Sequence, residues 1–231
     1  GEMFVHQIFH RWNGWLPYST QFRPRSGADR QFYSEGWNEY YCDRVLNALD
    51  VFPKDWGLLR EWYETYKKEY RGTDKDVAVG RLSDSGLQCC GEAWAFIAYR
   101  KSALVTYMLD NRIKSRTEGE FSLDDIVAGI WRRYGNRKGH FNYQDVIDIF
   151  EYVTGKDFSE FFDTYVFGNK PLEIPELEGV PKASFAYLPS RPAVDEEVTF
   201  DASNSTDPDG SIDAYRWDWD SDGSYDLSTD S

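Results

Sequence analysis

Residues 6–10 read His-Gln-Ile-Phe-His, and this stretch decides how the rest of the chain is interpreted. On an α-helix, two side chains four positions apart lie on one face, so the imidazoles of His6 and His10 can reach a single ion. The chain has 3 histidines, and two of them fall at this spacing. Apolar neighbours such as Ile8 and Phe9 predict a buried helix. Two histidines on a buried helix also occur without a metal, so the spacing alone leaves both interpretations open.

A second helix is predicted to begin at Ser34, as its N-cap, with Glu35 in the first turn. The carboxylate of Glu35 would complete a His-His-Glu ligand set and leave the fourth position of a zinc ion to water. Glu39 lies one helical turn further on, where it either supports a ligand through a hydrogen bond or faces solvent. The two segments together predict the catalytic type of zinc site.

Several short motifs follow the histidines in a fixed order. They are Trp12-Asn13, Arg23-Pro24, Ser34-Glu35-Gly36 with the aromatic pair Tyr40-Tyr41, and Tyr99-Arg100-Lys101-Ser102-Ala103-Leu104. This series resembles the glycyl aminopeptidase family of gluzincin zinc metallopeptidases and, more distantly, aminopeptidases of the alanyl and leukotriene-hydrolase type. The resemblance covers about residues 1–168 and is most specific around the metal helix. Ser102 stands where the family has glycine.

The resemblance implies a role for each candidate residue. His6, His10 and Glu35 would bind zinc. Tyr99 would donate a hydrogen bond to the oxyanion that forms on a peptide or protein substrate. In the family, a glutamate takes the proton of the zinc-bound water, and here that position is Gln7. A glutamine holds water but accepts no proton at neutral pH. The sequence therefore predicts either a zinc aminopeptidase crippled by loss of its general base, or a pseudoenzyme that binds peptides or serves as a scaffold.

The chain is expected to be mainly helical, with a small and incomplete β-sandwich. Apolar residues recur at helical spacing in residues 1–170, and the resemblance identifies this part as the helical half of a thermolysin-like metallopeptidase domain. Ser122 with Asp125 predicts the start of one helix, and Gly155 the end of another. Prolines among acidic residues predict a linker at 171–181, and alternating runs predict strands in 182–231. The family places a β-rich part before the metal helix, so we expect that part upstream of Gly1.

The C-terminal motifs resemble a second family. Three segments occur in the order that is found in PKD-type domains, which are immunoglobulin-like β-sandwiches: residues 200–205 (FDASNS), 207–212 (DPDGSI) and 215–218 (YRWD). About fifty residues are too few for a complete sandwich. Such domains accompany secreted or surface proteases, so the resemblance implies a secreted or cell-surface protein.

The same region carries a run of acidic residues. Asp218, Asp220, Asp222 and Asp226 have the spacing of the front of an EF-hand calcium loop, with Gly223 at the sixth position. Position twelve is Thr229, so the usual bidentate glutamate is missing. An acidic, solvated hairpin has the same spacing, and the sequence leaves calcium and the hairpin as alternatives.

Composition excludes several classes of partner. The net charge is −14, with 40 acidic against 26 basic residues, which argues against nucleic acid because phosphate binding needs clustered Lys and Arg. The longest apolar runs fall short of the ~18 residues that a membrane-spanning helix needs. An aromatic content of 17% favours a folded core over disorder. Cys42, Cys89 and Cys90 are interpreted either as buried thiols or as one disulfide with a third thiol left over.

Overall fold

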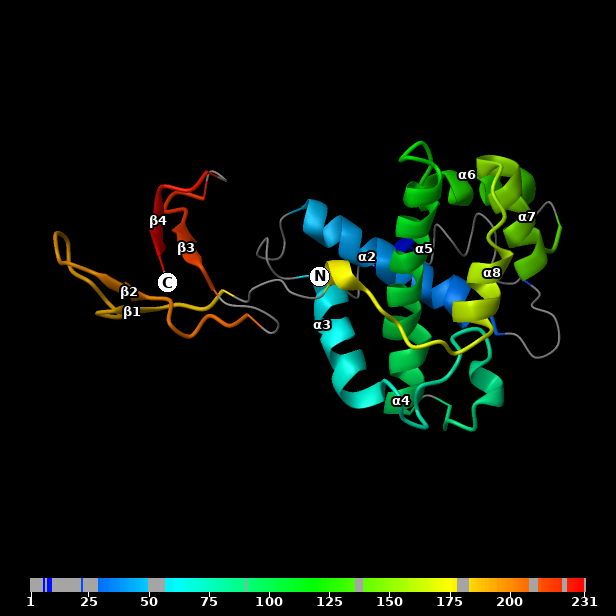
Figure 1. The fold of residues 1–231 in the computed structure, drawn as a ribbon, viewed down its shortest axis with the longest axis horizontal. Helices are drawn as coiled ribbons and strands as arrows, with labels where there is room; N and C mark the ends of the chain where they lie inside the picture. The colour runs from blue at the N-terminus through cyan, green and yellow to red at the C-terminus, as the bar shows by residue number, and fades with distance from the viewer. Residues whose placement is uncertain are drawn as a thin grey trace. The chain divides into compact units, whose positions relative to one another are not determined.

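The structure is a computed structural model of the 231-residue chain. It describes residues 6, 8–9, 22, 29–49, 57–89, 91–135, 139–177, 183–207, 212–221 and 224–230. The chain divides into two compact units, residues 1–173 and 174–231. The first unit is helical, and the second carries the strands (Figure 1).

Helices build the first unit, and several of them contain a π turn. In chain order the described elements are η1 (Phe32–Gly36), α2 (Trp37–Ala48), α3 (Leu58–Thr65), η2 (Tyr66–Tyr70), η3 (Leu82–Asp84), α4 (Glu92–Ala95), η4 (Phe96–Lys101), α5 (Ser102–Arg116), α6 (Leu123–Tyr134), α7 (Tyr143–Thr154), α8 (Ser159–Phe161) and η5 (Phe162–Val166). The segments η1, η2, η4 and η5 are π-helical, and each adjoins an α-helix without a break. The elements α4, η4 and α5 therefore form one continuous helix.

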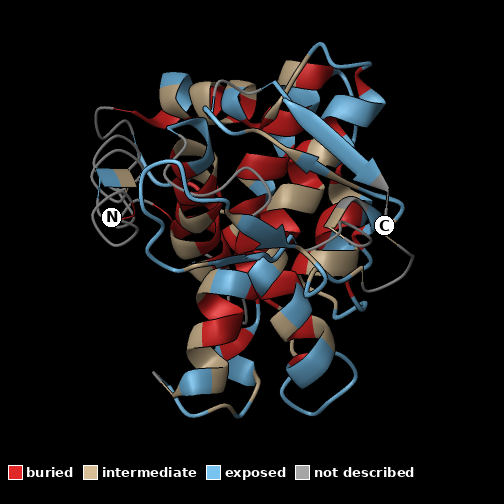
Figure 2. Cartoon of the chain, turned by 90° about the vertical axis from the view of Figure 1, so that its left-hand side faces the viewer, coloured by how far each residue is buried: buried red, intermediate tan, exposed pale blue. Residues whose placement is uncertain are grey.

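The core of this unit surrounds α5, which packs against α2, α3, α6 and η1 (Figure 1). Leu104, Val105, Leu109 and Ile113 of α5 are all 0% exposed. Burying one such side chain contributes about 1.5–3 kcal/mol. Figure 2 shows that buried residues lie on the inward faces of the helices and exposed residues on the outer faces. Burial on α5 therefore fixes the elements that carry the candidate site residues.

Local signals fix where two of these helices begin and end. Ser122 and Asp125 form the predicted capping box, in which Asp125 Oδ2 accepts a hydrogen bond from Ser122 N at 2.9 Å. Asn142 and Asp145 form a second box at the start of α7. That helix ends at Gly155, whose φ of 66° lies in the left-handed region that glycine adopts without strain. The predicted start of α6 and the predicted end of α7 are confirmed.

Two local predictions are wrong. Ser34 is not an N-cap, because the helix already begins at Phe32 and the preceding Gln31 has helical angles. Phe32 and Tyr33 are 0% and 2% exposed, so extending the helix toward the N-terminus buries two aromatic rings. Ile8 is 49% exposed, although its apolar surroundings in the sequence predict a buried position. Tertiary burial outweighs the capping preference in the first case.

Two antiparallel hairpins contain the described strands of the second unit, after a short η6 (Pro175–Leu177). β1 (Ala186–Leu188) pairs with β2 (Thr199–Asp201), and β3 (Ala214–Trp217) pairs with β4 (Leu227–Asp230). Aromatic rings from both hairpins pack together, with Phe200 5.7 Å from Trp217 between ring centroids. The expected fold class, mainly helical with a small, incomplete β part, is confirmed. The PKD-type assignment and the domain bounds stay predictions.

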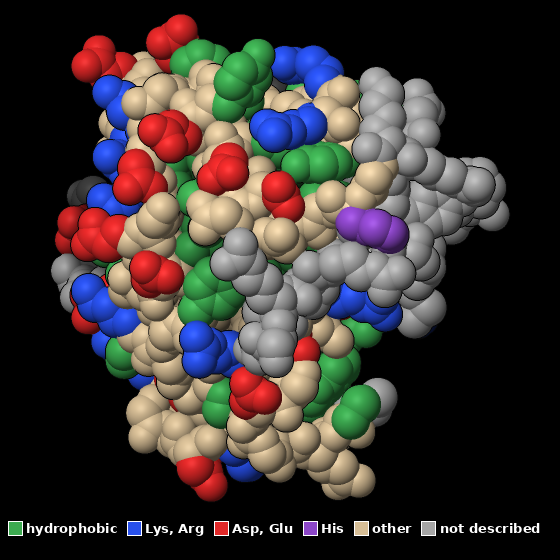
Figure 3. Space-filling view, turned by 90° about the vertical axis from the view of Figure 1, so that its right-hand side faces the viewer, with side chains coloured by type: hydrophobic (Ala, Val, Ile, Leu, Met, Phe, Trp, Pro, Cys, Tyr) green, Lys and Arg blue, Asp and Glu red, His purple; other side chains and the backbone are tan. Residues whose placement is uncertain are grey.

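The surface carries both signs of charge. On the face shown in Figure 3, the coloured Asp and Glu side chains are interspersed with Lys and Arg side chains around apolar ones. Exposed ion pairs such as Lys67–Glu64, 2.8 Å apart, contribute about 0–1 kcal/mol each. Stability therefore rests mainly on the core. Within the described part of the chain, none of the helices combines the length and the apolar character needed to cross a membrane.

Candidate metal centre

Two π turns carry candidate site residues. Glu35 lies in η1 and Tyr99 in η4, and these two segments pack against each other. π turns are rare and are frequently found at functional sites. The contact is tight at Gly36, where an added Cβ would lie 2.5 Å from the Cβ of Ser102. Only glycine allows this approach, so Gly36 sets how closely the Glu35 turn can lie to the Tyr99 turn.

His6 lies between two carboxylates. Its Nε2 is 3.6 Å from Glu35 Oε2, and its Nδ1 is 3.1 Å from Glu39 Oε1. The side chains of His6, Glu35 and Glu39 are 9%, 17% and 12% exposed, so the cluster is largely shielded from water. Glu35 Oε1 also accepts a hydrogen bond from Ser34 Oγ at 3.1 Å. The sequence left Glu39 either supporting a ligand or facing solvent, and the structure places it against the imidazole.

The two carboxylates control the protonation of His6. Burial alone would lower its pKa, but hydrogen bonds to Glu35 and Glu39, together with their charges, outweigh burial and raise the pKa from 6.5 to about 9. Without a metal, His6 is therefore a cation at neutral pH. Two adjacent carboxylates favour a cation between them. A divalent metal bound to His6 would replace the proton that the imidazole carries.

Tyr99 lies close to the imidazole of His6. Its ring centroid is 6.0 Å from that of His6, and the ring of Trp94 lies 6.4 Å from Tyr99 in an edge-on arrangement. Tyr99 is half-buried. The structure thus brings together His6, Glu35, Glu39 and Tyr99, which come from segments more than ninety residues apart in the sequence. His10 and Gln7, the other two predicted members, lie outside the described residues.

The donor set fits a zinc ion. Zinc binds imidazole nitrogen and carboxylate oxygen at about 2.0–2.2 Å in tetrahedral geometry, which places two ligand atoms roughly 3.4 Å apart. The separation of His6 Nε2 and Glu35 Oε2, 3.6 Å, is close to that value. Glu39 is placed to hold Nδ1, as carboxylates commonly do for metal-bound histidines.

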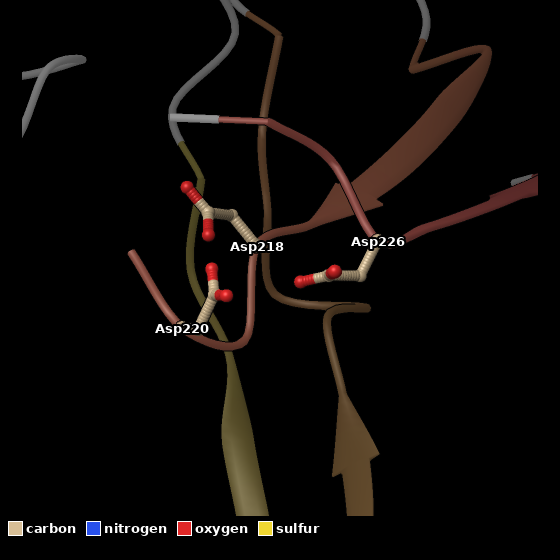
Figure 4. Close-up of side chains that lie close together, drawn as sticks. All are labelled: Asp218, Asp220 and Asp226. Atoms are coloured by element: carbon tan, nitrogen blue, oxygen red, sulfur yellow. The ribbon is translucent and has the colours of Figure 1, made fainter. Parts of the chain in front are cut away.

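The acidic loop of the second unit is also partly described. Carboxylate oxygens of Asp218, Asp220 and Asp226 lie within 4.8 Å of one another, as Figure 4 shows for the three side chains. Asp226 Oδ2 accepts a hydrogen bond from Trp219 N at 2.7 Å. Asp222 lies outside the described residues. Exposed acidic groups often gather without an ion, and the calcium site stays a prediction.

Sequence reasoning missed one buried group beside the site. Lys101, two residues after Tyr99, is 1% exposed and is paired with Asp76. A signal was present, since Lys101 is flanked by the apolar residues Ile97, Ala98, Ala103 and Leu104. A lysine among apolar residues is either buried with an acidic partner or extends past its neighbours to water. The sequence alone does not identify which residue is the partner.

Comparison with known proteins shows the fold. No protein-family model matches the chain, and no curated protein matches it. Among solved structures, the chain is similar to an aminopeptidase N family protein from Idiomarina loihiensis, with a TM-score of 0.59 and 19% sequence identity. The match covers 76% of this chain and 32% of that chain, so this chain spans about a third of the length of the aminopeptidase. At this identity the similarity establishes an aminopeptidase-like fold.

Proposed function

We propose that this chain is the helical part of a zinc-dependent metallopeptidase of the aminopeptidase type, in a form whose general base is replaced by Gln7. The observation that carries the proposal is the position of the His6 imidazole, 3.6 Å from Glu35 Oε2 and 3.1 Å from Glu39 Oε1. The Tyr99 ring lies beside it, and the aminopeptidase-like fold supports the same assignment.

Three residues would hold the metal. His6 through Nε2 and Glu35 through Oε2 would be ligands, with His10 as the third by its spacing from His6. Glu39 would accept the Nδ1 proton of His6 and so fix the tautomer that leaves Nε2 open for coordination. A bound zinc ion polarises a carbonyl and lowers the pKa of bound water toward 7.

Two other residues would act on the substrate and the water. The hydroxyl of Tyr99 would donate to the oxyanion as the scissile carbonyl becomes tetrahedral. The amide of Gln7 would hold the attacking water by a hydrogen bond but would leave its proton in place. General acid–base catalysis contributes about 100- to 10,000-fold, so hydrolysis by this form should be slower by that factor than with a glutamate.

The second candidate is a pseudoenzyme of the same fold, which binds peptides without turnover or serves as a scaffold. Gln7 is the observation that favours it, because the substitution leaves zinc binding possible while removing the proton acceptor. For both candidates we propose a secreted or cell-surface location and an upstream β-rich part that completes the substrate site. The upstream part rests on the resemblance of the sequence to gluzincin metallopeptidases, and the location rests on its resemblance to PKD-type domains.

The test is hydrolysis of aminoacyl fluorogenic substrates by the full-length protein with zinc, comparing the protein that carries Gln7 with its Gln7→Glu variant. We expect the variant to be at least about 100-fold faster. His6→Ala added to Gln7→Glu should abolish the gain and serves as the matched control. If neither form hydrolyses peptides while zinc is bound, the peptidase proposal is wrong and the pseudoenzyme replaces it.

A further inference from the structure

A buried cation lies next to the candidate site. The ammonium of Lys101 donates hydrogen bonds to Asp76 Oδ1 at 2.6 Å, Val77 O at 2.7 Å and Asn169 Oδ1 at 2.7 Å. These bonds use all of its protons. Burial lowers the pKa of Lys101, and the charge of Asp76 opposes that effect. A buried cation is costly unless it is fully paired, and Lys101 has a complete set of partners.

The acceptors of Lys101 are themselves held in place. Asp76 Oδ2 accepts a hydrogen bond from Tyr66 Oη at 2.9 Å, and the amide of Asn169 donates to the Asp76 carbonyl. Tyr66 Oη in turn accepts from Leu172 N at 3.2 Å. We call Lys101 with Asp76, Val77 and Asn169 the lysine anchor. It joins the end of η4 to two segments without helix, and Tyr66 links it to η2, so its position is determined from several directions.

The lysine anchor holds the turn that carries Tyr99 two residues after that tyrosine. Residues of an α-helix advance by roughly 100° each, and those of a π turn by somewhat less, so residues two apart point to nearly opposite sides. Tyr99 faces the His6 ring, and Lys101 points away from it into the anchor. Holding Lys101 therefore prevents the turn from rotating about its axis. Ser102 Oγ adds a bond to Ile97 O at 2.8 Å within the same turn.

We propose that Lys101 is a positioning residue, which fixes the Tyr99 side chain in its orientation toward the metal centre through the buried anchor. The consequence for catalysis rests on the proposed function, because it needs Tyr99 to act on the oxyanion. The mechanical part, immobilisation of Tyr99 by Lys101, is independent of that function.

Two variants test the proposal in the full-length protein. Lys101→Met removes the ammonium but leaves the Asp76 carboxylate buried, which can unfold the protein. Lys101→Met combined with Asp76→Asn removes both charges and is the variant expected to stay folded. The control is Lys114→Met, since Lys114 lies in the same continuous helix and also pairs with an aspartate, Asp110, at 2.7 Å, but is 45% exposed. Asp110 keeps its hydrogen bonds from Tyr40 Oη and Leu123 N in that variant.

The first readout is the fluorine NMR spectrum of 3-fluorotyrosine placed at position 99. One narrow resonance is expected for the parent and for Lys114→Met, and a broadened or split resonance for the folded Lys101 variants. The second readout is hydrolysis in the Gln7→Glu background. There kcat should fall about 100-fold with KM and zinc affinity unchanged, because misplacing a reacting group by about 1 Å costs that much.

A double-mutant cycle separates positioning from general loss of structure. Once Tyr99→Phe has removed the hydroxyl, the Lys101 variants should slow the reaction no further. A fluorine resonance that stays narrow and unshifted, or rate losses that multiply with that of Tyr99→Phe, would overturn the proposal. If Gln7→Glu is inactive with zinc bound, the proposed function fails, and the fluorine spectrum still decides whether Lys101 holds Tyr99.

Discussion

The helical unit buries acidic side chains that the β unit leaves in contact with water. Asp43, Asp76 and Asp110 are 3%, 7% and 0% exposed. Each accepts hydrogen bonds, for example from Leu59 N to Asp43 and from Leu123 N to Asp110. In the β unit, Asp220 and Asp226 are exposed and Asp218 is half-buried. A buried carboxylate must be paired, so its surroundings are fixed, whereas an exposed one stays solvated wherever the loop carries it.

This difference bears on the two predicted metal sites. The residues around His6 are held by tertiary contacts, as its distances to the half-buried Glu35 and Glu39 show. The aspartates of the β unit sit in one exposed loop, where an ion itself would have to supply much of the order. Substitutions in the helical unit should therefore have larger effects on stability and metal binding than substitutions in the β unit.

The largest effect is expected from Asp110→Ala. Its carboxylate accepts hydrogen bonds from Tyr40 Oη, from Lys114 Nζ at 2.7 Å and from Leu123 N at 2.7 Å. Removing it leaves two buried donors without an acceptor, at about 1–3 kcal/mol each, so the free energy of unfolding should drop by about 2–6 kcal/mol. Urea denaturation followed by far-UV circular dichroism measures this.

Asp220→Ala is the matched change in the β unit. A surface substitution of this kind usually stays within about 0.5 kcal/mol. If Asp110→Ala and Asp220→Ala lowered the free energy of unfolding equally, the contrast between the two units would be wrong.

The second effect concerns zinc affinity. Glu39→Gln keeps the size of the side chain but removes the charge beside His6 Nδ1, 3.1 Å away. Loss of such a supporting carboxylate typically costs 10- to 100-fold in metal affinity, and we expect a loss of about that size in competition with a zinc chelator. Glu160→Gln, at an exposed position of α8, should leave the affinity unchanged. Unaltered affinity in Glu39→Gln would show that Glu39 does not support the ligand.

A structural feature could be predicted from the sequence where neighbouring residues determine it, and could not where residues far apart in the chain determine it. The Ser122–Asp125 box and the Gly155 end are set within a few residues, and both predictions held. The proximity of His6 to Glu35 was expected from the motif resemblance. The lysine anchor could not be predicted, because Lys101 meets Asp76 across 25 residues and Asn169 across 68. The π turns at Glu35 and Tyr99 likewise depend on tertiary packing, which the spacing of apolar residues in the sequence does not reveal.

The third effect is a pH dependence confined to the helical unit. The pKa of His6 is raised to about 9 in the folded protein from 6.5, so its proton stabilises the metal-free fold. That stabilisation is complete below pH 6.5 and is lost as pH rises toward 9. Zinc must displace the same proton, so its apparent affinity should rise with pH over this window by up to about tenfold per unit. Isothermal titration calorimetry between pH 6 and 9 measures it, and a flat affinity would contradict the position of His6 between two carboxylates.

The smallest effect is expected in the aromatic cluster of the β unit. Trp219 stacks on Trp217 with ring centroids 5.2 Å apart and planes 7° from parallel, yet Trp219 is 49% exposed. An aromatic pair contributes about 0.5–1.5 kcal/mol, so Trp219→Ala should destabilise only the β unit and by no more than that. Near-UV circular dichroism during thermal unfolding checks this, with Tyr152→Ala on α7 as the control, since Tyr152 is 81% exposed. A loss above about 3 kcal/mol would mean that the β unit has a tighter core than its exposure indicates.

The central claim is that the helical unit holds a zinc ion through His6 and Glu35. The most direct test is zinc content after equilibrium dialysis of the full-length protein, compared with His6→Ala, Glu35→Ala and Asp220→Ala. We expect one zinc per chain in the parent and in Asp220→Ala, and loss of that zinc in both helical-unit variants. Stoichiometric zinc that persists in His6→Ala, or no stoichiometric zinc in the parent, would contradict it.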